Sequence, residues 1–318
     1  MTTYIIRRLI QAVFVAFVVT IIVFLAMRLL PGDPIYMILT QNDFQTVNQE
    51  EIERIRGEYG LDKPMAIQYI KWIGSVITGD LGESMVEKEA VIDQLCRRLP
   101  VTIYISILSV IVASVLGVLA GIISAVKYGT WIDNVVSIIA YIGLTIPIFL
   151  LGIVLIYFVG LKLGLLPLHG YTSPFEDFVM HIKKLVMPVF CMSIFAVAAN
   201  ARQTRSMMIE VLHQDYIRTA RAKGLGERMI IINHALKNAL IPVVTMIGMH
   251  FRFAFGNAVV IETIFNINGI GSLLVDAVNI RDYPVVQGST LLVAIMVIMI
   301  NLFIDLSYAW LDPRIQYN

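Results

Sequence analysis

The sequence predicts an all-α integral membrane protein with six transmembrane helices, and three observations support this fold class. First, 58% of the 318 residues are hydrophobic and only 15% are charged, whereas a soluble domain carries about 25% charged residues. Second, six apolar segments approach or exceed the roughly 20 residues that a bilayer-spanning helix needs. Third, basic residues cluster beside these segments in a way that orients them in a membrane.

The apolar segments define the expected spans. They cover residues 9–29, 101–126, 135–161, 185–201, 239–260 and 285–311. The first segment is too long for a cleaved signal peptide and has no small-residue cleavage site. We therefore expect it to be kept as a signal anchor.

Basic residues predict the orientation of these spans. Four groups fall on one side if the chain crosses six times: Arg7 and Arg8, Lys127, the cluster at 202–237, and Arg314. Cytoplasmic loops carry such an excess, so both termini are expected in the cytoplasm. A short loop on the opposite side, around 162–184, also carries lysines and runs against this pattern.

The long loop at 31–100 is expected to form a small helical cap outside the membrane. Asn48 and Glu51 form a capping-box pattern, and Gly60 is placed to end the helix that follows. A second helix is expected from Asp62-Lys63-Pro64 to Gly79, and a third at 89–98. The expected division is 1–30, the insertion 31–100, and a five-helix core at 101–318 that includes a polar segment at 209–238.

Small residues predict where two spans pack closely. The second span contains Gly117-x-x-x-Gly121, and small residues at this spacing let helices approach within a membrane. We expect a contact within the chain rather than a dimer seam.

Motifs for chemistry are absent from the sequence. There is no G-x-x-x-x-G-K-[ST] phosphate loop, no G-x-S-x-G elbow, and no close ligand spacing among the five histidines. The net charge of +1 argues against nucleic acid. Cys96 and Cys191 are expected at different levels of the fold and therefore unpaired. We expect no catalytic residue, metal site or cofactor on this chain.

Ionisable residues inside the spans leave two interpretations open. Arg252 lies about 16 Å into the fifth span, where a charge is costly. Asn301 and Asp305 share a face of the sixth span. Arg252 and Asp305 are expected either to pair across helices, or to line a substrate path together with Asn257 and Asn301. His250 is expected to be a hydrogen-bonded packing residue.

The polar segment between the fourth and fifth spans is the most specific feature. Residues 215–223 are rich in alanine and basic residues, and Gly224 is a natural helix stop. A second short helix is expected at 228–238. The alternative is a solvated basic connector near anionic lipid, which explains the charge but not the Ala/Gly spacing. We expect Tyr216, Ala220 and Gly224 to form one contact face.

This segment resembles the coupling loop of ABC importer permeases, whose pattern is E-A-A-x-x-x-G followed by I-x-L-P. Arg218-Thr219-Ala220 stands at the E-A-A positions, Gly224 at the glycine, and Ala239-Leu240-Ile241-Pro242 at the closing motif. The replaced Glu and Ala and the longer spacer are similar to the oligopeptide/dipeptide branch. Further stretches resemble that branch: Pro31-Gly32-Asp33-Pro34, Gly60-Leu61-Asp62-Lys63-Pro64, Gly79-Asp80-Leu81-Gly82, Leu165-Leu166-Pro167, Arg281-Asp282-Tyr283-Pro284 and Asp312-Pro313-Arg314.

The resemblance implies a first-permease (B-type) subunit with a type I importer fold, in the inner membrane of a prokaryote. It implies a second homologous permease, two ABC ATPases that bind ATP and Mg, an extracytoplasmic solute-binding protein, and a peptide or peptide-like solute. Membrane lipid surrounds such a permease. The residues implied to couple it to the ATPases are Asp215, Tyr216, Arg218, Thr219, Ala220, Arg221, Ala222, Lys223 and Gly224.

Two other function classes are alternatives for a chain with this many apolar segments. An intramembrane enzyme requires a catalytic pair at depth, and no such pair is evident. A secondary transporter favours inverted repeats and interrupted helices, and no clear repeat relates the two halves. The cargo stays open among dipeptides, longer peptides, nickel chelates, glutathione and oligosaccharides.

Overall fold

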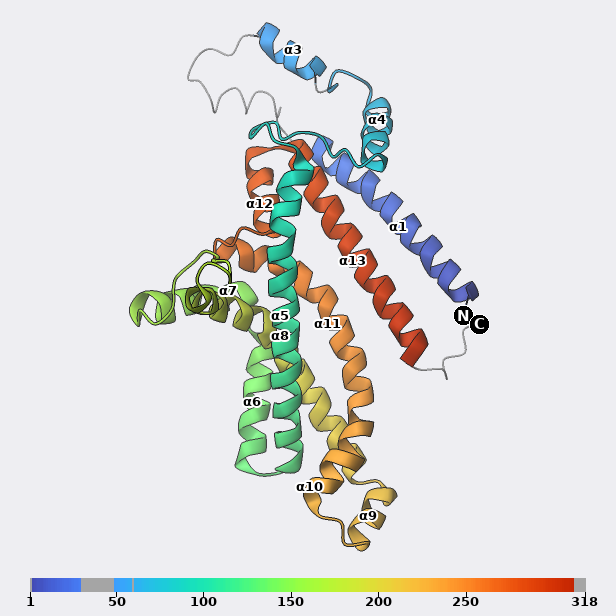
Figure 1. Cartoon of the computed structure of the whole chain (residues 1–318), viewed down its shortest axis with the longest axis vertical. Coiled ribbons are helices and arrows are strands. Elements are labelled where there is room, and N and C mark those ends of the chain that lie inside the picture. Colours follow the sequence, from blue (N-terminus) through green and yellow to red (C-terminus); the bar gives the residue numbers. More distant parts are fainter. Residues whose placement is uncertain (1, 30–48, 59, 312–318) are drawn as a thin grey trace. The chain divides into compact units, whose positions relative to one another are not determined.

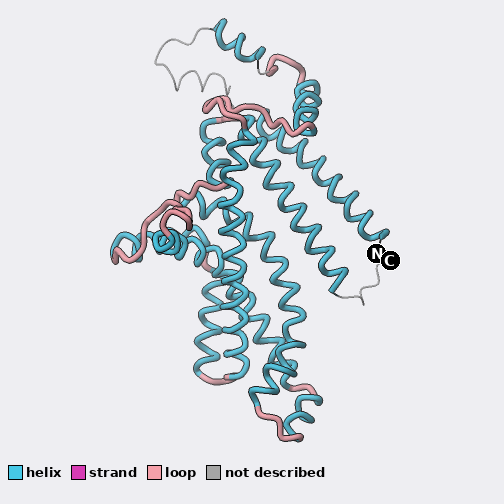
Figure 2. Tube along the Cα trace, in the orientation of Figure 1, coloured by secondary structure: helices cyan, strands magenta, loops and turns pink. Residues whose placement is uncertain are grey.

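The computed structural model describes residues 2–29, 49–58 and 60–311, and every named element in these ranges is a helix (Figure 1, Figure 2). The chain forms two compact units, residues 1–102 with 268–318, and residues 103–267. The sequence division placed residues 101–318 in one core. Contacts instead group the last helices with the N-terminal part of the chain, because α13 packs along α1.

The first unit contains α1 (Thr2–Leu29), α3 (Gln49–Glu58), α4 (Met65–Ile77), the start of α5 (Val91–Val126), α12 (Ile270–Ile280) and α13 (Tyr283–Leu311). Its core includes Met27, Val91, Leu95, Leu273 and Val286. Gly60 and Gly79 follow α3 and α4 with φ of +63° and +86°, the left-handed geometry that glycine adopts without a Cβ penalty. The predicted helix ends are confirmed here, whereas Asn48 of the capping box lies outside the described residues.

The predicted third helix of the insertion is not separate. Residues 91–98 are the first turns of α5, which continues through Pro100 to Val126. Proline usually interrupts a helix, because its ring clashes with the preceding turn and it has no N–H to donate. Here the helix continues through Pro100 nonetheless. Arg97 in the second turn of α5 donates hydrogen bonds of 2.5 and 2.6 Å to Glu89, which precedes the helix. These bonds lower the pKa of the Glu89 carboxyl.

Helix α12 was not predicted, because its eleven residues are too few for a span. It ends at Arg281, whose φ is 56°. The next residue, Asp282, is buried and accepts hydrogen bonds from Ser84 Oγ (2.5 Å), Met85 N (3.2 Å) and Val86 N (3.4 Å). Asp282 thereby fixes the loop before α5 to the start of α13.

The second unit contains α6 (Trp131–Thr145), α7 (Ile148–Leu155), the π-helix η1 (Ile156–Lys162), α8 (Phe178–Leu212) and α11 (Leu236–Ile264), together with short helices described below. The predicted third span at 135–161 is not one straight helix. It is bent by 106° between α6 and α7, because Pro147 has no N–H to continue the α6 ladder. Within the described ranges, five helices are long and apolar enough to cross a membrane, or six if this bent pair counts as one span.

Helices α5 and α8 pack at the predicted glycine pair. A Cβ added to Gly117 would lie 2.6 Å from Asn200 Cβ, and one added to Gly121 would lie 2.5 Å from Thr204 Cβ. Asn200 Nδ2 also donates to the carbonyl of Ala113 (3.2 Å). The predicted intrachain contact at Gly117-x-x-x-Gly121 is confirmed.

Candidate coupling site at α9

Helix α9 (Asp215–Ala222) is a short amphipathic helix after α8. It begins after Gln214, whose backbone is extended, and Asp215 places an acidic group in the first turn, where the helix dipole favours it. Gly224 follows with φ +81°, so the predicted glycine bend is confirmed.

The expected second cytoplasmic helix is not a separate element. Helix α10 (Glu227–Met229) continues through a π-helical turn, η2 (Ile230–Ala235), directly into α11. The flanking residues Met229, Ile230 and Leu236 all keep right-handed helical backbone, so no turn separates the segments. Pro242 therefore lies inside α11 rather than at its start.

The inner face of α9 is part of the hydrophobic core of the second unit. Ile217 is fully buried and Ala220 is 7% exposed. They belong to a cluster with Met208 of α8, Ala235 of η2 and Ala239 of α11. The predicted contact face of Tyr216, Ala220 and Gly224 is therefore wrong in one member, because Ala220 points into this core.

The outer face of α9 carries Asp215, Arg218, Thr219 and Ala222, all exposed. At about 100° per residue these positions lie opposite Ile217 and Ala220. The side chains of the outer face are mostly polar and short, and the small side chain of Ala222 does not protrude at the centre of this face.

Polar bonds brace both ends of α9. Thr219 Oγ1 donates to the carbonyl of Asp215 (3.0 Å), and Tyr216 Oη accepts from Asn238 Nδ2 (2.9 Å). Arg221 Nε bonds Glu227 (2.8 Å) across the Gly224 turn. Lys223 is exposed. The helix is thus held at a fixed angle to α11.

A buried ion pair lies further along α8, and sequence reasoning missed it. Arg205 bonds both oxygens of Asp133, at 2.6 and 2.8 Å, and Asp133 also accepts from Ser124 Oγ (2.5 Å) and Gly129 N (3.0 Å). Asp133 is 2% exposed. The sequence feature that could have indicated this ion pair is Asp133, a single acidic residue at the start of an apolar segment.

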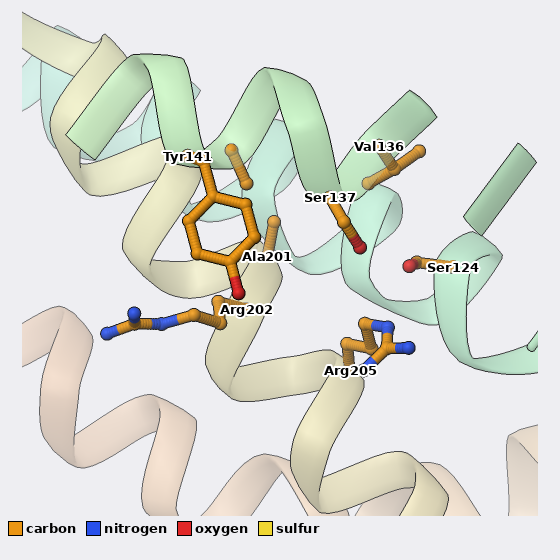
Figure 3. Close-up of a pocket in the computed structure, with 8 residues that line it drawn as sticks. Ser124, Val136, Ser137, Tyr141, Ala201, Arg202 and Arg205 are labelled. Atoms are coloured by element: carbon orange, nitrogen blue, oxygen red, sulfur yellow. The ribbon is translucent and has the colours of Figure 1, made fainter. Parts of the chain in front are cut away.

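A pocket of about 50 Å³ adjoins this ion pair. Ser137 and Tyr141 of α6 face Arg202 and Arg205 of α8 across it (Figure 3). The ion pair links the α5–α6 turn to α8, and Arg205 lies ten residues before α9 begins. It therefore stiffens the helix that leads into the candidate coupling site.

The predicted path residues fall in different units. Arg252 is exposed and Asn257 is half-buried on α11 of the second unit. Asn301 and Asp305 are half-buried on α13 of the first unit. Within the first unit, Asp305 forms an ion pair with Arg8 (3.1 Å). Their lining of a path stays a prediction.

The structure also describes the surroundings of the predicted histidine and of the two cysteines. His250 is buried and its ring lies edge-on to Phe195, with centroids 6.4 Å apart, as the expected packing role predicts. Neither ring nitrogen has a hydrogen-bond partner among the described residues, so the expected hydrogen bond is not found. Cys96 and Cys191 are both free thiols, as expected. Among the described residues, no group of three or more His, Cys, Asp or Glu side chains has a geometry that would hold a metal ion.

The chain matches two family models along most of its length. Residues 117–317 match the binding-protein-dependent transport system inner membrane component, and residues 1–106 match its N-terminal membrane component. These matches include α9 and the helices that hold it.

Full-length relatives and one solved fold agree with these models. The chain is 38% identical to the "Probable peptide ABC transporter permease protein y4tP" of Sinorhizobium fredii over all of both chains. It is 39% identical to the glutathione transport system permease protein GsiC of Escherichia coli K12, again over all of both. The MetNI methionine ABC transporter, in inward-facing form, matches 69% of this chain and 96% of its own, with TM-score 0.55 and 20% identity.

The helical membrane fold and the names of these relatives define a transporter component rather than an enzyme. The chain belongs to the family of binding-protein-dependent transport system inner membrane components. It is a permease subunit of an ABC importer in a bacterial inner membrane, with the type I fold expected from the sequence. Permeases of this class work with ATPase and binding-protein partners.

Proposed function

We propose that this permease pairs with a second, homologous permease to pass a peptide-like solute, and that α9 is the element through which two ATPases drive it. The observation that carries the proposal is the two-sided character of α9. Ile217 and Ala220 fix it to its own chain, while Asp215, Arg218, Thr219 and Ala222 remain exposed.

Force applied to α9 reaches two long helices at once. Its apolar face touches Met208 near the end of α8 and Ala239 near the start of α11, and α8 and α11 pack against each other. Interlocked helices of this kind move as rigid bodies rather than deform. ATP binding and hydrolysis on the ATPases thereby switch the permease between inward-facing and outward-facing states.

ATP and Mg belong to the ATPases in this proposal, and no cofactor binds this chain. Both termini lie in the cytoplasm, so that α9 meets the ATPases there. The names of two full-length relatives, one for peptides and one for glutathione, support a peptide-like solute delivered by the extracytoplasmic binding protein. Uptake of labelled di- and tripeptides by cells with and without this gene tests the cargo.

The docking role is tested by Ala222→Trp. Ala222 is exposed and a large ring there leaves the chain's own core intact, but it should prevent close approach of an ATPase to the centre of the outer face. We expect loss of ATPase co-purification and at least a ten-fold drop in solute-stimulated hydrolysis in reconstituted membranes.

The matched control is Ala66→Trp, an equal change on the exposed surface of α4. It should keep ATPase binding and hydrolysis at the level of the unchanged protein. Equal co-purification of the ATPases with the Ala222→Trp and Ala66→Trp variants would remove α9 from the mechanism.

A further inference from the structure

The first unit contains an open cavity of about 170 Å³ beside the carboxyl end of α1. Helix α4, the turn at 80–85 and the first turn of α13 form its walls. Three basic side chains line it, from Arg28, Lys63 and Lys71, against the single carboxylate of Asp80. Asp80 already accepts a hydrogen bond from Gly82 N (2.8 Å). The cavity therefore has an excess of positive charge.

Two residues that line this cavity each carry a buried donor atom with no hydrogen-bond partner among the described residues. These donors are Nη1 of Arg28 and Nε2 of Gln287. Gln287 is only 4% exposed. Arg28 itself is held firmly: its Nε donates to Gln68 Oε1 (2.8 Å), and its guanidinium lies 4.8 Å from the Phe24 ring centre. A buried donor without an acceptor is costly, so the cavity favours an anion with several acceptor oxygens.

Aromatic side chains of the kind found at the headgroup level of a membrane lie beside the cavity. Tyr69 of α4 shares a 2.8 Å hydrogen bond with Thr20 of α1, and the Phe24 ring contacts those of Tyr69 and Trp72 at 5.4 and 5.9 Å. Tyr and Trp gather at the membrane–water boundary. Upstream of this cluster α1 exposes apolar side chains, and α4 exposes Ile70 and Ile77.

We propose that this cavity binds the phosphate of an anionic phospholipid. Arg28 and Gln287 donate to the phosphate oxygens from inside, and Lys71 approaches from the exposed side of α4. The acyl chains lie along the exposed apolar surfaces of α1 and α4. The bound lipid fastens the insertion to the first helix. This inference is independent of the proposed cargo and of α9.

The test is native mass spectrometry of the full chain in detergent, titrated with phosphatidylglycerol. We expect saturable retention of one lipid at this site. Lys71→Gln should weaken it about five-fold, the contribution of one basic residue near an anionic lipid. Arg28→Gln should weaken it at least as much. The control Lys183→Gln, an exposed lysine of the second unit, should leave retention unchanged.

Further probes separate the lipid from other anions. Oleate, which lacks phosphate, should bind more weakly than phosphatidylglycerol, and millimolar inorganic phosphate should not displace the lipid. Full displacement by inorganic phosphate would overturn the proposal in favour of a free-anion site. Equal retention by the unchanged protein and Lys71→Gln would overturn it as well, and Lys71→Gln tests it even if Arg28→Gln misfolds. Protection of Lys71 from amine labelling by the binding protein, but not by lipid, would assign the cavity to protein docking.

Discussion

At the residue scale, two alanines two positions apart have opposite roles. Ala220 is packed in the core between α8 and α11, whereas Ala222 is exposed. Ala220→Leu should destabilise the protein by about 1–3 kcal/mol through overpacking, and Ala222→Leu should change it by less than about 0.5 kcal/mol. Thermal unfolding of both variants in one detergent measures the difference, and equal melting temperatures would contradict the assignment of faces.

The Asp133–Arg205 pair is a second single-residue determinant. Asp133→Asn leaves the Arg205 guanidinium without its counter-charge, and breaking a buried pair costs about 3–5 kcal/mol. Because the Arg205 side chain is 30% exposed, we expect the lower end of that range. Thermal unfolding checks it.

The double variant Asp133→Asn with Arg205→Gln serves as the control for that pair. It should lose less than the sum of the two single changes if the pair is coupled. Additive losses would mean that the two side chains act independently.

At the scale of elements, the α5–α8 contact depends on the absence of side chains. A Cβ at Gly117 would lie 2.7 Å from the carbonyl oxygen of Val197 as well as 2.6 Å from Asn200 Cβ, and backbone atoms cannot move aside cheaply. Gly117→Ala should therefore lower the melting temperature markedly, although alanine is the better helix former.

Gly256→Ala is the matched control for this contact. Gly256 lies inside α11 and an added Cβ there meets nothing within 4 Å. We expect it to be neutral or slightly stabilising, as helix propensity predicts. A larger loss at Gly256 than at Gly117 would contradict the packing of α5 on α8.

At the scale of the whole molecule, the proposed function assigns ATP binding to the ATPase subunits and not to this chain. The purified permease, free of other subunits, should show no saturable binding of a fluorescent ATP analogue, because its sequence has no phosphate-cradling loop. The same assay on the complex with its ATPases should show binding. Tight, saturable binding to the chain alone would contradict this division of labour.

The sequence by itself determined the fold class, the places of the long helices, the glycine bend at Gly224 and the close contact at Gly117. These follow from local rules: span length, left-handed glycine and small-residue spacing. Only the tertiary structure decided that 135–161 is bent, that 91–98 belongs to α5, that Ala220 faces inward, and that Asp305 pairs with Arg8. A repeat along a helix shows which residues share a face, but which face is buried depends on neighbours distant in the chain. The same holds for ion pairs, since the attraction between two charges depends on their distance in space and not on their separation in the sequence.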